Sequence, residues 1–522
     1  MRPYFPIRDG AAARAYEQTV LREQADVERA VMEAGEAIAA ALDADFREWR
    51  PWPEAPRILV LAGKGLNAAD AIVASAGLAR RHPGLQVVVA RSHPAAADHP
   101  LLTAALERLR GLLGERLKVL EAGEPLPSMP VEVVIDGLYG LNFRPPLAEA
   151  DRQRFKEVEA LPWPPLRVAI DLPSGVGETV DPGAFVADFT YLVGVAKRPA
   201  FATAARAHVG RLRFLPLEIF AGDDAMTPER LVHPRAYVTW NRLRPAQADK
   251  RQFGHGLIVA GSLSMPGAAA MATAACLEAG AGLVTTFAPK EVVTALAGSL
   301  PEAMWRLVPI NNEGGVAVEA VPMAAELARR GGAMLIGPGL PVDRATRFTV
   351  SRLVREIHLP IVLDASALFP EILPAVMTRP ASAGPVVLTP HAGEWERLTG
   401  GMDPGLSPEA ALKAFSLKYR VTVLLKGVPS LVASEGALYF LPAGGPVLAR
   451  GGSGDILAGM LLALLAQDAR HPLEAVCAAV TWHGAAADSL AREKGQVAVR
   501  TTALLSHLST VLRAVPCHKA NT

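Results

Sequence analysis

The sequence predicts an α/β protein with two domains, of which the first is a doubly wound parallel sheet. Its 522 residues exceed what one hydrophobic core usually organises. Short apolar runs alternate with segments of helical periodicity in both halves, as in α/β proteins. Residues 221–250 interrupt this alternation with scattered prolines and charges. We therefore expect one domain at residues 1–225 and a second at residues 226–522.

The first half begins with a helical segment and then alternates strands and helices. Residues 8–43 are expected to be helical, because VERAVMEAGEAIAAAL carries apolar residues at helical spacing. The apolar runs that follow predict strands at residues 57–63, 86–90, 118–122, 131–136 and 167–171.

Polar side chains stand where several of these strands end. Asn67 and Asp70 follow the first strand. Asp136 ends VVID, and Asp171 ends VAID shortly before Ser174. Ligands of doubly wound sheets bind beyond the carboxyl ends of the strands, so these residues together indicate a site. Each of them taken singly is equally compatible with a helix cap or a turn.

The same alternation resumes in the second half. A small-residue helix is expected in PGAAAMATAACLEAGAG, and LEAVCAAVTWHGAAADSLAREK is expected to be helical near the end. Strands are predicted at residues 255–262, 283–289, 333–339, 360–366, 385–391 and 421–427. His391 and Lys426-Gly427 stand at the ends of the last two of these strands.

A glycine-rich loop before a helix is the most informative stretch of the chain. RGGSGDILAG, residues 450–459, leads into an apolar helical run over residues 456–466. Unpaired backbone N–H groups at a helix N-terminus bind phosphate, and Asp455 is placed to act as a base. Lys426 adds a cation suited to phosphates. Together they indicate phosphoryl transfer, although Lys426 alone could be a surface lysine and His391 alone a helix cap. Neither a Walker A pattern nor GxGxxG is present.

Composition gives no support to several other classes of protein. The formal net charge of +1 does not indicate the excess of basic residues with which proteins bind nucleic acid or an anionic membrane. Cys276, Cys477 and Cys517 are not in a paired spacing, which argues against a disulfide framework or a zinc site. The N-terminus lacks a signal-peptide core, and ILAGMLLALLA is too short to span a bilayer. We expect a cytoplasmic protein without a nucleic-acid or membrane partner.

These motifs resemble a known family. GGSGDILAG resembles the GGTGDxLAG signature of the ADP- or ATP-dependent NAD(P)H-hydrate dehydratases, and IGPGL, LDASAL, LTPHAGEWERL, LLKGVPS and WHGAAAD match in order. The first half is similar to the partner epimerase domain through VMEAGEAIA, VVIDGLYG and VAIDLPSG. The whole chain resembles the bifunctional NAD(P)H-hydrate repair enzymes. The resemblance implies an N-terminal Rossmann-like, doubly wound domain followed by a C-terminal ribokinase-like α/β domain.

The resemblance implies a reaction for the second domain. It would restore NADH or NADPH from the S hydrate while converting ADP to AMP and phosphate, with Mg²⁺ as cofactor. Asp455 would be the base and would also contact the hydrate. The expected hydrate-binding residues are Ala269 (or its neighbour Ala268), Gly339 and His391. The expected nucleotide-binding residues are Lys426, Gly427, Val428, Pro429, Ser430 and Gly454.

The first domain would interconvert the R and S hydrates. Asp171 would be its acid/base and would bind the hydrate together with Asn67, Asp70 and Gly140. Potassium would be held by Asn67, Asp136 and Ser174, which offer hard oxygen donors.

The epimerase motifs are altered in one loop. Where the family has GxGNNGGDG, residues 63–71 read GKGLNAADA, with Leu66 in place of an amide and three alanines in place of glycines. DGLYGLN also lacks the last glycine of the family motif. Because alanine rarely adopts positive φ, we expect a weakened epimerase.

Two alternatives remain from the sequence. One is a ribokinase-like kinase that phosphorylates a vitamin precursor. The other is a dehydratase whose N-terminal domain is a non-catalytic binding scaffold. Small-residue helices such as PGAAAMATAACLEAG permit close subunit packing, and we expect a homo-oligomer.

Overall fold

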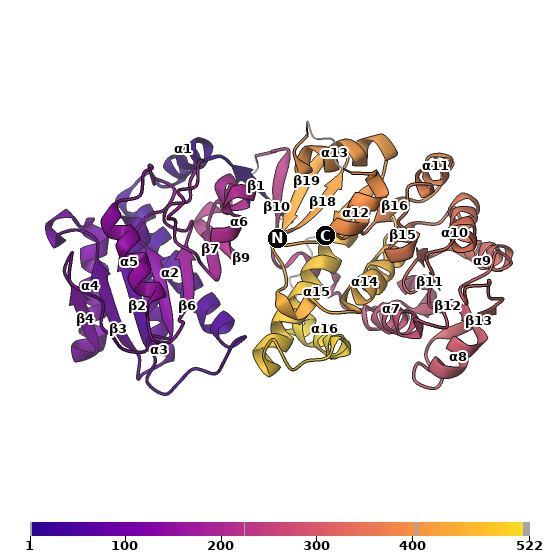
Figure 1. Cartoon of the computed structure of the whole chain (residues 1–522), viewed down its shortest axis with the longest axis horizontal. Helices are drawn as coiled ribbons and strands as arrows, with labels where there is room; N and C mark the ends of the chain where they lie inside the picture. Colours follow the sequence, from indigo (N-terminus) through magenta and orange to yellow (C-terminus); the bar gives the residue numbers. More distant parts are fainter. Residues whose placement is uncertain (1–2, 224, 402–405, 515–522) are drawn as a thin grey trace. The chain divides into compact units, whose positions relative to one another are not determined.

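The computed structural model describes residues 3–223, 225–401 and 406–514 (Figure 1). The chain divides into two compact units, Met1–Thr227 with Ala491–Gly495 and Pro228–Leu490 with Gln496–Thr522. We call them the N-terminal and the C-terminal unit. Cys276 and Cys477 are buried thiols, whereas Cys517 lies outside the described residues.

The N-terminal unit contains a 7-stranded sheet in the order β4-β3-β2-β5-β6-β7-β9, in which all neighbours are parallel. The strands are β2 (Arg57–Ala62), β3 (Gln86–Arg91), β4 (Leu117–Leu120), β5 (Val133–Gly137), β6 (Leu166–Ile170), β7 (Phe189–Val193) and β9 (Arg211–Leu215). The chain runs outward from β2 to β4 and then returns to β5 on the other side of β2. The strand order therefore reverses between β2 and β5, where such sheets bind ligands.

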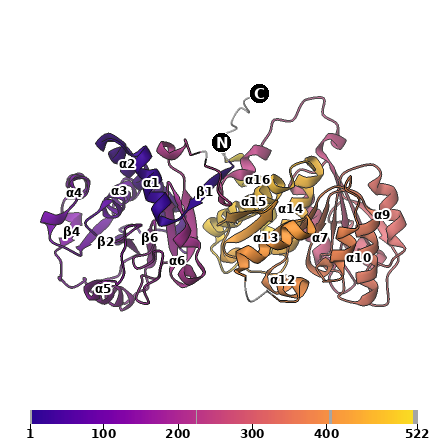
Figure 2. The ribbon, with the colours of Figure 1, turned by 90° about the horizontal axis from the view of Figure 1, so that it is seen from above.

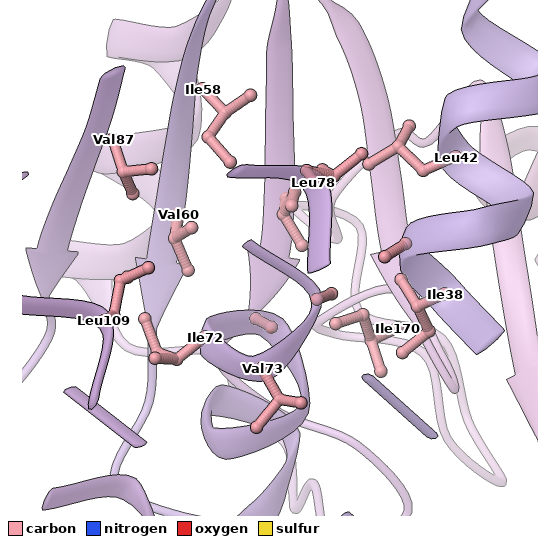
Figure 3. Close-up of a cluster of buried hydrophobic side chains, with 14 of the residues drawn as sticks. Ile38, Leu42, Ile58, Val60, Ile72, Val73, Leu78, Val87, Leu109 and Ile170 are labelled. Carbon is pink, nitrogen blue, oxygen red and sulfur yellow. The ribbon is translucent and has the colours of Figure 1, made fainter. Parts of the chain in front are cut away.

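Helices cover both faces of this sheet. α2 (Gln24–Phe46), α3 (Leu66–Arg81) and α4 (Pro100–Leu113) share a core with one face, and α5 (Glu149–Glu159) packs on the other. Along β2, Ile58 and Val60 belong to the first core, shown in Figure 3, and Leu59 and Leu61 to the second. Burial on both faces explains why this strand reads as a continuous apolar run.

The N-terminal segment differs from the expected single helical stretch. It forms β1 (Tyr4–Arg8), α1 (Gly10–Val20) and α2, and β1 pairs in parallel with the short β8 (Ala196–Lys197). α1 ends at Val20 with Leu21 as its C-cap, and α2 begins with a capping box between Glu23 and Asp26. Apolar periodicity continues across residues 8–43, so the break is set by local capping hydrogen bonds rather than by a change of pattern.

The strands of the C-terminal unit follow the order β13-β12-β11-β14-β15-β16-β17-β18-β19-β10. Only the β17–β18 and β18–β19 pairs are antiparallel. The bounds are β10 (Glu229–Val232), β11 (His255–Val259), β12 (Leu283–Pro289), β13 (Met304–Val308), β14 (Ala333–Ile336), β15 (Ile361–Leu363), β16 (Val386–Leu388), β17 (Thr422–Leu425), β18 (Ser430–Ser434) and β19 (Ala437–Leu441). The predicted α/β class is confirmed for both halves of the chain.

Two helices of small residues pack closely in this unit. α7 (Pro266–Glu278) and α14 (Ser453–Gln467) lie side by side (Figure 1 and Figure 2). A Cβ at Gly459 would lie 2.2 Å from the carbonyl oxygen of Ala272, so only glycine permits this approach. The remaining helices are α6 (Arg206–Val209), α8 (Lys290–Leu296), α9 (Ala320–Ala328), α10 (Arg344–Glu356), α11 (Ile372–Met377), α12 (Ala392–Thr399), α13 (Pro408–Tyr419), α15 (Pro472–Lys494) and α16 (Leu504–Arg513). Over the described stretches of the chain, none of the helices has the length and apolarity to cross a membrane.

Two candidate active sites

A cavity of about 610 Å³ lies at the carboxyl ends of the N-terminal strands. Its lining includes Asn67 and Asp70 from α3, Gly140 after β5, Asp171 after β6 and Lys197 from β8. Four of these five residues were predicted as substrate-binding from the sequence. The fold thus brings together side chains that are far apart in the chain, at the position where the strand order reverses.

Asp136 and Ser174 form a buried pair beneath this cavity. The Ser174 hydroxyl donates to Asp136 Oδ1 at 2.6 Å, and the Ser174 backbone N–H donates to Oδ2 at 2.7 Å. Burial raises the pKa of Asp136 to about 6, although the hydrogen bonds from Ser174 act in the opposite direction. A buried carboxylate with no cation beside it is stabilised when a positive ion binds nearby.

Asn67 is fixed by its amide nitrogen. Nδ2 donates to the carbonyl oxygens of Tyr139, at 2.9 Å, and Ile170, at 3.0 Å, which orients Oδ1 away from them. A Cβ at Gly140 would lie 2.9 Å from this Oδ1 atom. Asn67, Asp136 and Ser174 therefore offer oxygen donors of the kind that a hard monovalent cation requires. Within the described ranges, no group of three or more His, Cys, Asp and Glu side chains could hold a metal ion.

Asp171 follows β6 in a strained conformation. Its φ of 65° lies in the left-handed region, which is uncommon for a residue with a side chain. Oδ1 accepts a hydrogen bond from Lys197 Nζ at 2.6 Å. Burial raises the pKa of Asp171, Lys197 lowers it and Glu17 raises it further, so that the net shift is upward. A carboxyl group held in this way, with a raised pKa, is suited to accept and return a proton.

Asp70 provides a second carboxyl group at the cavity. Its Oδ1 atom is buried and has no hydrogen-bond partner among the described residues. Burial, and then the neighbouring Asp171, raise the pKa of Asp70 well above its ordinary value. The two carboxyl groups thus differ, since only Asp171 is in contact with a cation.

The altered loop is accommodated without the strain that we expected. α3 already begins at Leu66, so the alanines adopt helical conformations, and Ala68, Ala69 and Ala71 are fully buried in the core. In residues 63–71, all of which are described, no residue has a positive φ. The expectation that alanine would be strained here is therefore wrong. Leu66 lines the cavity, where the family has an amide.

The C-terminal site is centred on the first turn of α14. Its N-cap residue, Gly452, has a φ of 88°, and the N–H groups of the first turn follow directly. Burial, and then repulsion from Asp364 and Glu394, raise the pKa of Asp455 to about 6, with Lys426 opposing this shift. Asp455 is therefore a base poised close to neutral pH.

Lys426 connects the parts of this site. Its Nζ lies 2.8 Å from Asp364 Oδ1 and 3.7 Å from Glu394 Oε2. Burial would lower the pKa of Lys426, but the carboxylates of Asp364 and Glu394 outweigh it and raise the pKa. A Cβ at Gly454 would lie 3.5 Å from Nζ, so the ammonium group sits beside the start of α14.

His391 is the N-cap of α12. Its Nδ1 accepts hydrogen bonds from the backbone N–H groups of Gly393, at 3.1 Å, and Glu394, at 3.3 Å. The backbone N–H of His391 in turn donates to Glu394 Oε2 at 2.8 Å. The helix cap that the sequence left open is thus present. The side chain is also 59% exposed, which leaves it able to contact a ligand.

The remaining predicted residues of the C-terminal site lie in two places. Gly339 has a φ of 65°, and a Cβ there would lie 2.7 Å from Ala268 Cβ. Ala269 is fully buried and faces Gly261, so Ala268 is the alanine next to Gly339. Residues 426–429 form the turn between β17 and β18, and the hydroxyl of Ser430, the first residue of β18, donates to the Gly427 carbonyl at 3.1 Å. Val428 is 75% exposed in this turn.

Four charged residues of the two sites were not assigned a role from the sequence: Glu17, Lys197, Asp364 and Glu394. Asp364 stands at a strand end and Glu394 lies three residues after His391, so strand-end and capping patterns could have indicated both. Lys197 carries no comparable signal, because its role arises from contacts with residues distant in the chain.

The geometry defines a class of protein, a two-site α/β enzyme with acid–base chemistry in one unit and an anion-binding helix start in the other. Residues 27–198 match the family model described as YjeF-related protein N-terminus. Residues 256–510 match the NAD(P)H-hydrate dehydratase model.

Similar proteins cover nearly the whole chain. The bifunctional NAD(P)H-hydrate repair enzyme Nnr of Gloeobacter violaceus is 34% identical, with 89% of each chain covered. That of Thermosynechococcus vestitus is 31% identical over 98% of this chain and 99% of its own. The chain belongs to the family of bifunctional NAD(P)H-hydrate repair enzymes, and the resemblance noted in the sequence is confirmed. A crystal structure of the Bacillus subtilis ADP/ATP-dependent NAD(P)H-hydrate dehydratase, co-crystallised with ATP and Mg²⁺, is 29% identical and covers 54% of this chain and 97% of its own, with a TM-score of 0.46.

Proposed function

We propose that this protein repairs hydrated NADH and NADPH with two activities. Residues 226–522 dehydrate the S hydrate at the expense of ADP, and residues 1–225 interconvert the R and S hydrates. Family membership over both halves supports this function. The observation that carries it is Asp455, a carboxyl group with a pKa raised to about 6 at the anion-binding start of α14.

In the dehydration, Asp455 accepts the proton of the hydroxyl on the nicotinamide ring. The hydroxyl oxygen attacks the terminal phosphoryl group of ADP, and AMP leaves. The lone pair of the ring nitrogen then expels inorganic phosphate, and loss of a proton from the neighbouring ring carbon restores NADH or NADPH. The N–H groups at the start of α14 stabilise the transferring charge.

The residues around Lys426 support nucleotide binding. Lys426 lies beside the start of α14, and the exposed Val428 provides an apolar surface for a flat base. We assign the nucleotide site to Lys426, Gly427, Val428, Pro429, Ser430 and Gly454. We assign hydrate binding to Gly339, His391, Asp455 and the start of α7 at Ala268 and Ala269. Magnesium, when bound, neutralises phosphate charge, and the phosphates themselves would supply much of its coordination.

In the epimerisation, Asp171 accepts the proton of the ring hydroxyl while the bond from that carbon to the ring nitrogen breaks, with its electron pair going to the nitrogen and an aldehyde forming. Rotation and reclosure on the other face of the aldehyde give the second epimer, to which Asp171 returns the proton. Asn67, Asp70 and Gly140 line the same cavity and bind the hydrate. Potassium would be held by the side-chain oxygens of Asn67, Asp136 and Ser174, of which Asp136 is a buried carboxyl group hydrogen-bonded by Ser174. When bound, it supplies the positive charge that Asp136 lacks. The unstrained loop at residues 63–71 supports an active epimerase.

An assay with the separated S hydrate tests the dehydratase. The full chain and ADP are expected to restore the absorbance of the reduced nicotinamide, and ATP in a parallel reaction shows which nucleotide is preferred. A phosphorylated alcohol formed without reduced nicotinamide would instead identify the kinase alternative.

The R hydrate tests the N-terminal domain. Asp171→Asn is expected to stop use of the R hydrate while the S hydrate is still repaired. No acceleration of R-to-S conversion by the wild-type chain would identify a non-catalytic scaffold. The homo-oligomer and the cytoplasmic location stay predictions from the sequence.

A further inference from the structure

Lys197 is a buried lysine for which neither the fold nor the proposed chemistry has yet given a reason. Its side chain is 3% exposed and lines the N-terminal cavity. Burying an ammonium group is costly, and an apolar residue of similar size would fill the space without that cost. A lysine here therefore indicates a requirement for its charge.

All three donors of the Lys197 ammonium group are used. Nζ lies 2.6 Å from Asp171 Oδ1, 3.3 Å from Glu17 Oε1 and 3.2 Å from the Val193 carbonyl oxygen. An ammonium group has three N–H donors, so these contacts fix its position completely. The lysine thus holds one oxygen of the Asp171 carboxylate in a fixed place.

The charged neighbours of Asp171 differ in whether they favour or oppose a negative charge on its carboxyl group. Asp171 is faced by Asp70 from α3, Glu17 from α1 and Lys197 from β8. Two of these neighbours are carboxyl groups, which oppose a negative charge on Asp171. Lys197 is the neighbour that favours it, and Asp70 has no such contact among the described residues.

We propose that Lys197 is a positioning residue of the N-terminal site, which favours the ionised form of Asp171 and fixes one of its oxygens so that the carboxylate accepts the proton of the hydrate. The proposal rests on the proposed epimerase function. It assigns the proton acceptor to Asp171 and not to Asp70, because the cation contacts only the former. Glu17 helps to anchor the lysine from the opposite side.

Lys197→Met tests the proposal, because methionine keeps most of the side-chain volume and removes the charge. R-to-S conversion is measured across pH in the full chain, coupled to its own dehydratase activity with excess ADP. Loss of a contacting cation raises a carboxyl pKa by roughly one to three units. The acid limb of the pH profile is therefore expected to move upward by about one unit or more, with kcat reduced about 10-fold or more at neutral pH and KM changed little. Lys197→Arg is expected to recover most of the rate.

Glu17→Gln is the matched control, since it removes a charge from the same cluster but leaves the Lys197–Asp171 contact. It is expected to leave the acid limb in place or move it slightly downward. Unchanged dehydration of the S hydrate shows that the C-terminal unit of each variant is intact, and a circular-dichroism spectrum like that of wild type shows that the N-terminal unit is folded. A Lys197→Met profile that coincides with wild type, or an Arg variant as impaired as the Met variant, would overturn the proposal.

A second measurement separates this proposal from the epimerase function. In protein labelled with ¹³C at the aspartate carboxyl, the signal missing from Asp171→Asn identifies Asp171, and its titration is followed by NMR. We expect its midpoint to rise in Lys197→Met, even if the wild-type chain does not epimerise the hydrate. An unchanged midpoint overturns the role of Lys197, whereas absent epimerisation with a shifted midpoint refutes only the proposed activity of the domain.

Discussion

Replacing the base Asp455 with asparagine is expected to remove dehydration and at the same time to stabilise the C-terminal unit. The carboxylate stands among Asp364 and Glu394 in a largely buried position, and these surroundings raise its pKa from 3.8 to about 6. A carboxyl group whose pKa is raised by folding destabilises the fold once it is ionised. Asparagine has nearly the same shape but carries no charge.

The magnitude follows from the size of the shift. About two pKa units correspond to about 3 kcal/mol at 1.36 kcal/mol per unit, and solvent screening at a partly exposed site reduces this to about 1 kcal/mol. The sign depends on pH. Below pH 3.8 the carboxyl group is protonated in both states and the variant gains nothing, the gain grows between pH 3.8 and 6, and it is complete above pH 6.

Thermal unfolding of the wild-type and Asp455→Asn chains at pH 5 and pH 8 measures this difference. The variant is expected to unfold at a higher temperature at pH 8, with a smaller gain at pH 5, and to lack dehydration of the S hydrate. Asp468→Asn is a control on the same unit, because folding lowers the pKa of Asp468 and this carboxylate is expected to stabilise the fold. An Asp455→Asn chain that is less stable than wild type at pH 8 would refute the electrostatic account of the site.

Three further predictions concern the two reactions. The rate of dehydration is expected to fall as the pH drops through about 6, because Asp455 must be ionised to accept a proton. Below this pH the rate should decrease roughly tenfold per pH unit, and a rate independent of pH from 5 to 8 would count against this base. Gly140→Ala is expected to slow epimerisation at least tenfold without affecting dehydration, because its Cβ would lie 2.9 Å from Asn67 Oδ1. Gly177→Ala is the control for a glycine outside the site, since the nearest neighbour of its Cβ would be 3.7 Å away. Replacing K⁺ by a large organic cation at constant ionic strength is expected to lower epimerisation of the R hydrate selectively, and equal rates would argue against a potassium site at Asn67, Asp136 and Ser174.

Most of the strands that the sequence predicted are buried on both faces, although β4 is partly exposed. β2, β5 and β14 read as continuous apolar runs for this reason. β9 and β13 have partly exposed faces and polar residues, so no apolar run marks them. The β18–β19 hairpin was also missed, because the Lys426-Gly427 motif was interpreted as the end of a strand with no partner following it.

The same distinction applies to the sites. Asp455 and Asp171 could be identified because each belongs to a local pattern, a glycine-rich helix start and a strand end. Lys197 could not be identified in this way, since its contact with Asp171 spans 26 residues of the chain. Lys426 was predicted from its own motif, but its pairing with Asp364, 62 residues away, was not. The prediction of backbone strain in the loop at residues 63–71 was wrong, because the sequence could not show that α3 begins as early as Leu66.

The most direct test of the two-site account is the stoichiometry of repair starting from the pure R hydrate. The wild-type chain with ADP is expected to produce reduced nicotinamide, AMP and phosphate in equal amounts from this epimer. Asp171→Asn is expected to yield none of the three from the R hydrate and all three from the S hydrate, and Asp455→Asn none from either. AMP and phosphate released without reduced nicotinamide, or R hydrate repaired at an undiminished rate by Asp171→Asn, would contradict the account.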